Sequence, residues 1–295
     1  MEFGIKPLGR ERLWLWILLL PTLFGLFFSA FGSLLATIAL SFTHWDLLTV
    51  PEWAGLSNYV ALFTDAKFLK SLANTAEFSA MYVPGVVIIS LLVAILLNRK
   101  IRGIGIFRTA FYLPAVTSAV ATALVWNMIY GKDTGILNYV LSLVHLPPVC
   151  WLCTDHAMVS VVVVNIWGAI GEGMIIFLAG LTAIPREYYE AATVDGANEM
   201  HKFFRITLPL ITPSIFFQVL MSTINAFQAY DYIYMLTRQG QGDSNIPVVV
   251  FSIYRNAWNF GNYGGASAQA IELTVIVAVL MLVYFWLEKR FVVYE

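Results

Sequence analysis

Residues 157–181 read AMVSVVVVNIWGAIGEGMIIFLAGL, and residues 185–209, a few positions on, read PREYYEAATVDGANEMHKFFRITLP. The first stretch is apolar apart from a few small polar side chains and one carboxylate, Glu172. A helix of about 20 residues crosses the roughly 30 Å hydrocarbon core of a bilayer, and a helix satisfies its own backbone there. The first stretch therefore predicts a membrane-spanning helix, and the charged second stretch predicts a loop outside the membrane.

Five other segments of the chain are long and apolar enough to cross the bilayer in the same way. With 59% hydrophobic and only 12% charged residues among 295, the chain lacks the charge that a soluble domain of this length needs on its surface. The net charge of −1 gives no reason to expect a nucleic-acid partner. The fold class predicted is an all-α integral membrane protein with six spans: 13–40, 75–97, 109–130, 157–181, 209–230 and 268–287.

The first of these segments is too long for a cleaved signal peptide, whose apolar core is about 7–15 residues. We therefore expect it to be retained as a span. Of the 17 Lys and Arg residues, twelve fall in the two tails and in the connections after the second and fourth spans, and five fall in the other connections. The positive-inside rule then places both termini and the 185–209 loop in the cytoplasm.

The 185–209 loop has the signals of two short helices joined by a turn. Pro185 suits the first turn of a helix, and Glu187 and Glu190 lie near the positive end of its dipole. Asp195 and Gly196 supply a turn before a second helix that leads to Pro209. The sequence predicts a compact helix–turn–helix on the cytoplasmic face.

The same loop resembles the EAA loop of ABC importer permeases, whose pattern is EAA-x3-G-x9-I-x-L-P. Every fixed position matches: Glu190, Ala191, Ala192, Gly196, Ile206, Leu208 and Pro209. The resemblance implies the type I importer permease fold, with a loop that contacts a separate ATP-hydrolysing subunit. The residues that it implies for this contact are Glu187, Glu190, Ala191, Ala192, Asp195, Gly196 and Ala197.

The resemblance also implies the partners and the location of the protein. It implies a second, homologous permease subunit, two ATP-binding subunits and an extracytoplasmic solute-binding protein, all at the inner (plasma) membrane. No Walker A glycine loop is present, so we expect that this chain is not an enzyme and binds no cofactor, ATP and Mg²⁺ being used by the partner.

Outside the loop, the resemblance is to the first permease of maltose- and glycerol-phosphate-type importers. It rests on Gly55-Leu56-Ser57-Asn58-Tyr59 and on Ala226-Phe227-Gln228-Ala229-Tyr230-Asp231-Tyr232, and it implies a sugar or polyol substrate. The sequence departs from that pattern at 239–243, where QGQGD replaces the usual Gly-Gly-Pro. We divide the chain into a tail, first span and outer loop (1–72), a permease core (73–288) and a cytoplasmic tail (289–295).

Polar side chains inside the spans are candidates for the translocation path. An ionisable group at membrane depth costs about 2.5–3.5 kcal/mol on insertion scales, so Glu172 should face the bundle or a wet cavity. Either it lines the path, or a neighbouring helix satisfies it while its flanking glycines allow close packing. The other candidates, which could instead bond between helices, are Asn165, Asn225 and Gln228, with Tyr230 and Asp231 as parts of an outer gate. An alternative function is an ion-coupled secondary transporter that uses Glu172.

The two cysteines, Cys150 and Cys153, lie between His145 and His156 in the third outer connection. Two cysteines and two histidines allow a zinc site, an oxidised pair or two free thiols. Spacing alone does not choose among these, and no metal ligand is assigned.

Overall fold

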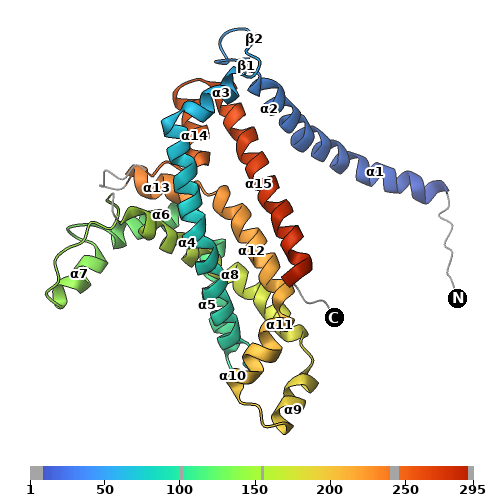
Figure 1. The fold of residues 1–295 in the computed structure, drawn as a ribbon, viewed down its shortest axis with the longest axis vertical. Helices are drawn as coiled ribbons and strands as arrows, with labels where there is room; N and C mark the ends of the chain where they lie inside the picture. Colours follow the sequence, from blue (N-terminus) through green and yellow to red (C-terminus); the bar gives the residue numbers. More distant parts are fainter. Residues whose placement is uncertain (1–8, 100–101, 154–155, 240–245, 292–295) are drawn as a thin grey trace. The chain divides into compact units, whose positions relative to one another are not determined.

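The computed structural model describes residues 9–99, 102–153, 156–239 and 246–291. It contains two compact units, one made of the chain up to Thr64 with Ile253–Glu272, and one made of Asp65–Ser252 with the chain from Leu273 on. Helices dominate both units (Figure 1). Some residues used in the sequence predictions lie outside the described residues. They are two of the twelve basic residues counted above, Lys6 and Lys100, together with 240–243 and the tail residues 292–295.

In the first unit, the predicted first span is one long helix with a wider π-helical stretch in its middle. Its apolar side chains are exposed along its length, as lipid-facing side chains are. The elements of this part are α1 (Gly9–Leu26), η1 (Phe27–Gly32), α2 (Ser33–Ser41), β1 (Thr43–His44), β2 (Glu52–Trp53) and α3 (Ser57–Thr64). The unit also holds η3 (Arg255–Asn259) and the start of α15 (Tyr263–Phe291).

The outer connection of the first unit is a small antiparallel hairpin, with Thr43 opposite Trp53. Asn58 is buried and donates from its amide to the carbonyls of Ser41 and Thr43, both at 2.9 Å. Tyr59 shares a 2.6 Å hydrogen bond with the Ser41 hydroxyl. Two residues of the Gly55–Tyr59 motif therefore hold the end of the first span to the hairpin.

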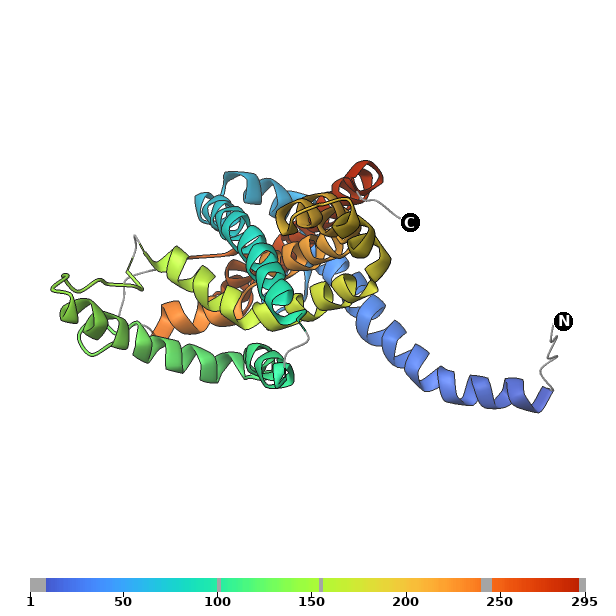
Figure 2. The ribbon, with the colours of Figure 1, turned by 90° about the horizontal axis from the view of Figure 1, so that it is seen from below.

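The second unit contains the remaining spans and their connections (Figures 1 and 2). Its elements are α4 (Ala66–Leu97), α5 (Ile104–Val116), α6 (Ala119–Ile129), α7 (Ile136–Leu143), α8 (Ala157–Ala183), α9 (Arg186–Val194), α10 (Glu199–Lys202), η2 (Phe203–Thr207), α11 (Leu208–Leu210), α12 (Thr212–Phe227) and α13 (Asp231–Gln239). The short helix α14 (Val249–Tyr254) runs from this unit into the first.

Four helices of the described residues are long and apolar enough to cross a membrane alone: Leu13–Ser41, Ala66–Leu97, Ala157–Ala183 and Tyr263–Arg290. The predicted third and fifth spans are instead bent pairs. The third is α5 and α6, which meet at 100°, and the fifth is Glu199–Leu210 and Thr212–Phe227, which meet at 63°. The six predicted spans result if each bent pair counts as one span.

Both bends have local causes. After Pro114, the Thr117 hydroxyl donates to the Pro114 carbonyl at 2.7 Å, and Thr117 and Ser118 adopt extended backbone, which ends α5. At the second bend, Pro213 has no N–H to offer the carbonyl of Pro209, and the Thr212 hydroxyl donates to that carbonyl instead, also at 2.7 Å.

The core of the second unit lies where α4 packs along α8 and α12. One cluster of buried side chains includes Phe78, Val86 and Val164, and a second includes Ala94, Phe177 and Ile211. Glycines of α8 bring neighbouring helices close: a Cβ on Gly171 would lie 2.7 Å from the Cα of Tyr112 on α5. Such small residues are typical of helix contacts inside membranes.

Candidate functional site

The first helix of the 185–209 loop, α9, is short and exposed. Pro185 has extended backbone and precedes the helix, and Glu187 lies in its first turn. Glu187, Glu190 and Ala191 are exposed, and Ala192 is half-buried. The predicted acidic, alanine-rich helix is therefore present and offers these side chains to a partner.

The turn after α9 is a Schellman motif centred on Gly196. The N–H of Gly196 donates to the carbonyl of Thr193 at 3.1 Å, and the N–H of Ala197 donates to that of Ala192 at 2.9 Å. Gly196 has φ +76°, a left-handed conformation that favours glycine. The turn predicted at Asp195–Gly196 is confirmed.

The second arm of the loop returns the chain to the fifth span (Figure 1). Asn198 caps α10 by accepting from the His201 N–H at 2.8 Å, as N-cap residues do. The arm then widens into the π-helical segment η2 and ends with α11. The predicted single short helix is thus α10, η2 and α11 in succession.

Large apolar side chains project from both arms of this otherwise polar loop. The exposed fractions are 88% for Val194, 67% for Met200 and 55% for Phe204. Exposed apolar side chains on a polar element make this loop a candidate surface for contact with a protein or a membrane. Val194 was missed by the sequence reasoning, although a valine in the last turn of a polar helix was an available signal.

One contact joins the two arms. The hydroxyls of Tyr189 and Thr207 lie 2.9 Å apart in a hydrogen bond across a sequence separation of 18 residues. Thr207 is buried, and the Tyr189 ring packs against the core cluster that contains Ile211. No local sequence pattern indicated this pair.

Three consecutive residues of α8 face three different directions. Gly171 lies against α5, and a Cβ on Gly173 would lie 2.5 Å from the Ser90 hydroxyl oxygen of α4. Glu172, between them, is exposed on the face that the second unit leaves uncovered. The glycines therefore have the packing role that was part of one of the two alternatives, and Glu172 itself is exposed.

The other candidates for the translocation path fall into two groups, those engaged within the protein and those exposed. Asn165 donates its amide to the carbonyl of Val161, one turn earlier in its own helix, at 2.9 Å. Asn225 and Gln228 are exposed at the end of α12, and Asp231 is exposed at the start of α13. Tyr230 lies between these helices with its ring stacked on that of Tyr234 at 5.2 Å. Asn165 is thus engaged with its own backbone, and the exposed candidates are available to a ligand or partner.

The connection between α6 and α8 is organised by one buried side chain, Asn138. Its amide donates to the carbonyls of Lys132 at 2.9 Å and Val149 at 2.8 Å, and its oxygen accepts from the Val149 N–H at 3.0 Å and the Trp151 indole at 3.1 Å. Cys150 and Cys153 follow and form a disulfide, which is the second of the three alternatives left by the sequence.

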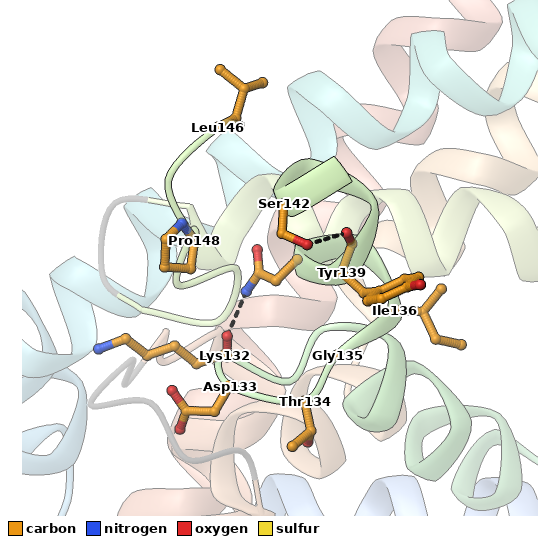
Figure 3. Close-up of a pocket in the computed structure, with 10 residues that line it drawn as sticks. Lys132, Asp133, Thr134, Gly135, Ile136, Tyr139, Ser142, Leu146 and Pro148 are labelled. Carbon is orange, nitrogen blue, oxygen red and sulfur yellow. Dashed lines mark hydrogen bonds between the residues drawn. The ribbon is translucent and has the colours of Figure 1, made fainter. Parts of the chain in front are cut away.

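The same connection lines an open pocket of about 390 Å³ (Figure 3). Charged and hydroxyl-bearing side chains line it together with apolar ones: Lys132, Asp133, Thr134, Gly135, Ile136, Asn138, Tyr139, Ser142, Leu146 and Pro148. All of these belong to this single connection, and none was a sequence candidate.

The sequence matches the family model described as "binding-protein-dependent transport system inner membrane component" over residues 66–293. The chain is 39% identical over 266 residues to the probable ABC transporter permease protein YesP of Bacillus subtilis, covering 88% of this chain and 85% of the relative. It is 33% identical over 244 residues to the trehalose/maltose transport system permease protein MalF of Thermococcus litoralis, covering 82% of each.

A solved structure has the same fold. A chain of a bacterial alginate ABC transporter, crystallised with a periplasmic protein that holds an alginate pentasaccharide, superposes with a TM-score of 0.81. The two chains are 24% identical, and the match covers 98% of each. At this identity the likeness concerns the fold.

Proposed function

Because this chain belongs to the family of binding-protein-dependent transport system inner membrane components, we propose that it forms half of the translocation pathway of an ATP-driven importer of sugars or polyols. The loop at 185–209 would dock on a separate ATPase subunit, which uses ATP and Mg²⁺. The observation that carries the proposal is this exposed loop, with apolar side chains on both arms and a fixed turn at Gly196.

The cargo class rests on the relatives. The archaeal relative is named for trehalose and maltose, and the structural neighbour carries alginate. A polyhydroxylated cargo also suits the exposed candidates for the path, which are Glu172, Asn225, Gln228 and Asp231; Tyr230 is half-buried, and Asn165 is the least available. Amide and carboxylate groups of this kind pair with hydroxyls.

The remaining parts of the transporter follow from the family. We propose a second homologous permease, two ATP-binding subunits and an extracytoplasmic solute-binding protein, with both termini of this chain in the cytoplasm. The alternative of an ion-coupled secondary transporter is not favoured, because the family is one of binding-protein-dependent systems.

Purification of the chain with its partners tests the proposal. We expect the chain to bring with it an ATPase subunit and a second permease when isolated in mild detergent. Isolation of the chain without any ATP-hydrolysing subunit would contradict the proposed function.

A substitution at the turn tests the role of the loop. In Gly196→Trp, the left-handed backbone conformation at residue 196 is strained for an L-residue. The turn should therefore be lost, and with it the proposed contact of the loop with the ATPase subunit. We expect loss of assembly or of stimulated ATP hydrolysis in reconstituted transporter. Wild-type stimulation in this variant would remove the loop from the coupling role.

A further inference from the structure

Tyr189 is the one tyrosine of α9 that faces the body of the second unit. Its neighbour Tyr188 has 47% of its surface exposed, whereas Tyr189 is half-buried and packs against the cluster that contains Leu181, Ile184 and Ile211. Its hydroxyl shares the 2.9 Å hydrogen bond with the Thr207 hydroxyl. The ring and the hydroxyl of Tyr189 thus make two separate contacts.

Thr207 lies at the foot of the fifth span. It is the last residue of η2, where the N–H of Leu208 donates to the carbonyl of Phe203, five residues back. The carbonyl of Thr207 in turn accepts from the N–H of Ile211 at 3.0 Å, and Ile211 is fully buried at the bend before α12. The Tyr189 hydroxyl is therefore bonded to the segment that leads directly into the 63° bend.

We propose that Tyr189 is a positioning residue that ties α9 to the foot of the fifth span, so that a displacement of α9 by the ATPase displaces that span. This inference rests on the proposed function, because it takes α9 as the ATPase contact. A π-helical segment is a frequent feature of functional sites, and here it holds the hydroxyl that the tyrosine needs.

The Tyr189–Thr207 hydrogen bond should also affect ATP hydrolysis by the resting transporter. The same contact through which the ATPase subunit would move the span would also let the resting span restrain α9 and, through it, the ATPase subunit. Removing the link should let the ATPase turn over without moving the pathway. Basal ATP hydrolysis, measured without cargo or binding protein, therefore reports on the hydrogen bond.

The test is the MgATP dependence of hydrolysis by the purified full transporter. Tyr189→Phe keeps the ring and its packing and removes only the hydroxyl. We expect the basal kcat to rise by about two- to tenfold, the range that one net hydrogen bond is worth, with KM for MgATP unchanged. Tyr139→Phe, at an exposed tyrosine of α7 outside the 185–209 loop, is the control and should leave both constants at the wild-type values.

Variants at Thr207 separate the hydrogen bond from packing. Thr207→Val should raise kcat as Tyr189→Phe does, although it also removes the 3.4 Å bond from the Thr207 hydroxyl to the carbonyl of Lys202. Adding Tyr189→Phe to Thr207→Val should have no further effect, and Thr207→Ser, which keeps a hydroxyl, should have the wild-type kcat. An unchanged kcat in Tyr189→Phe, or a fall in proportion to the yield of assembled transporter, would overturn the inference.

Failure of the inference and failure of the proposed function give different results. If the proposed function fails, the wild-type chain carries no ATPase subunit. If only the inference fails, the wild-type transporter is active and Gly196→Trp is impaired, while Tyr189→Phe and wild type have the same basal kcat.

Discussion

At a few positions the backbone conformation or a hydrogen bond requires one particular residue type. Gly196 and Gly105 can be compared, because a Cβ at either position would meet no atom within 4 Å. Gly196 has φ +76° at a turn, whereas Gly105 lies within α5. Only the first therefore requires glycine, and the requirement comes from backbone conformation rather than space.

Gly196→Ala should weaken the turn by about 1–2 kcal/mol, the cost of the left-handed conformation for an L-residue. The measurement is hydrogen exchange at the amides of Gly196 and Ala197, which bond within the turn. Gly105→Ala is the control and should be neutral or slightly stabilising, because alanine favours helix. Equal exchange in wild type and Gly196→Ala would contradict the argument.

The stability of the β1–β2 hairpin depends on pH through the carboxylate of Asp46. The side-chain hydroxyl and backbone N–H of Thr49, and then the N–H of Leu48, donate to its carboxylate and hold its pKa below the usual value. A group with a lowered folded-state pKa stabilises the fold above its unfolded pKa, and this contribution is lost as the pH falls through the folded value.

We therefore expect the amides of Leu48 and Thr49 to lose protection below about pH 4, the ordinary range of an aspartate. Hydrogen exchange corrected for the intrinsic pH dependence is the measurement. Asp46→Asn should show weak protection at every pH, and protection that stays constant down to pH 2 in wild type would disprove the role of the carboxylate.

At the scale of elements, the sequence predicted which segments cross the membrane better than it predicted their shape. Segment 157–181 became a single helix with slightly wider bounds, because nothing in it interrupts the backbone ladder. Segment 109–130 became two helices at 100°, because Pro114 and the Thr117 hydroxyl end the first. Hydrophobicity measures whether a segment enters lipid, and it carries no information on where a proline and a nearby hydroxyl end a helix within that segment.

The hydrogen bonds of the Asn138 side chain hold the connection between α6 and α8 together. Asn138→Ala should leave several buried partners unsatisfied and weaken the connection by about 1–3 kcal/mol. The amide of Val149, which donates to Asn138, should then exchange about 5- to 150-fold faster. Ser142→Ala is the control, because the Ser142 hydroxyl bonds only within its own helix, to the carbonyl of Tyr139. A Val149 amide that exchanges equally in Asn138→Ala and wild type would contradict this role.

For the whole molecule, charge distribution and one motif were sufficient to predict the family, but not the contacts that connect its parts. The turn at Gly196 was predictable because its cause lies within a few residues. The Tyr189–Thr207 bond and the bonds of Asn138 were not, because each joins positions 6 to 18 residues apart whose proximity depends on the packed fold.

The orientation of the chain is a prediction that cysteine labelling checks. The sequence holds only Cys150 and Cys153, which are joined, so an added cysteine supplies the one free thiol. A membrane-impermeant maleimide applied to intact cells should label Lys132→Cys and spare Ala191→Cys. Labelling of Ala191→Cys from outside would place the 185–209 loop on the wrong side for an ATPase.

The glycines on either side of Glu172 fix more than a packing distance. Gly171 packs against α5 and Gly173 packs against α4, so both neighbouring helices lie close to α8. The position of Glu172 is therefore set by the same contacts that pack α8. A methyl group at Gly171, which would lie 2.7 Å from the Cα of Tyr112, would push α8 away from α5 and carry the Glu172 carboxylate with it.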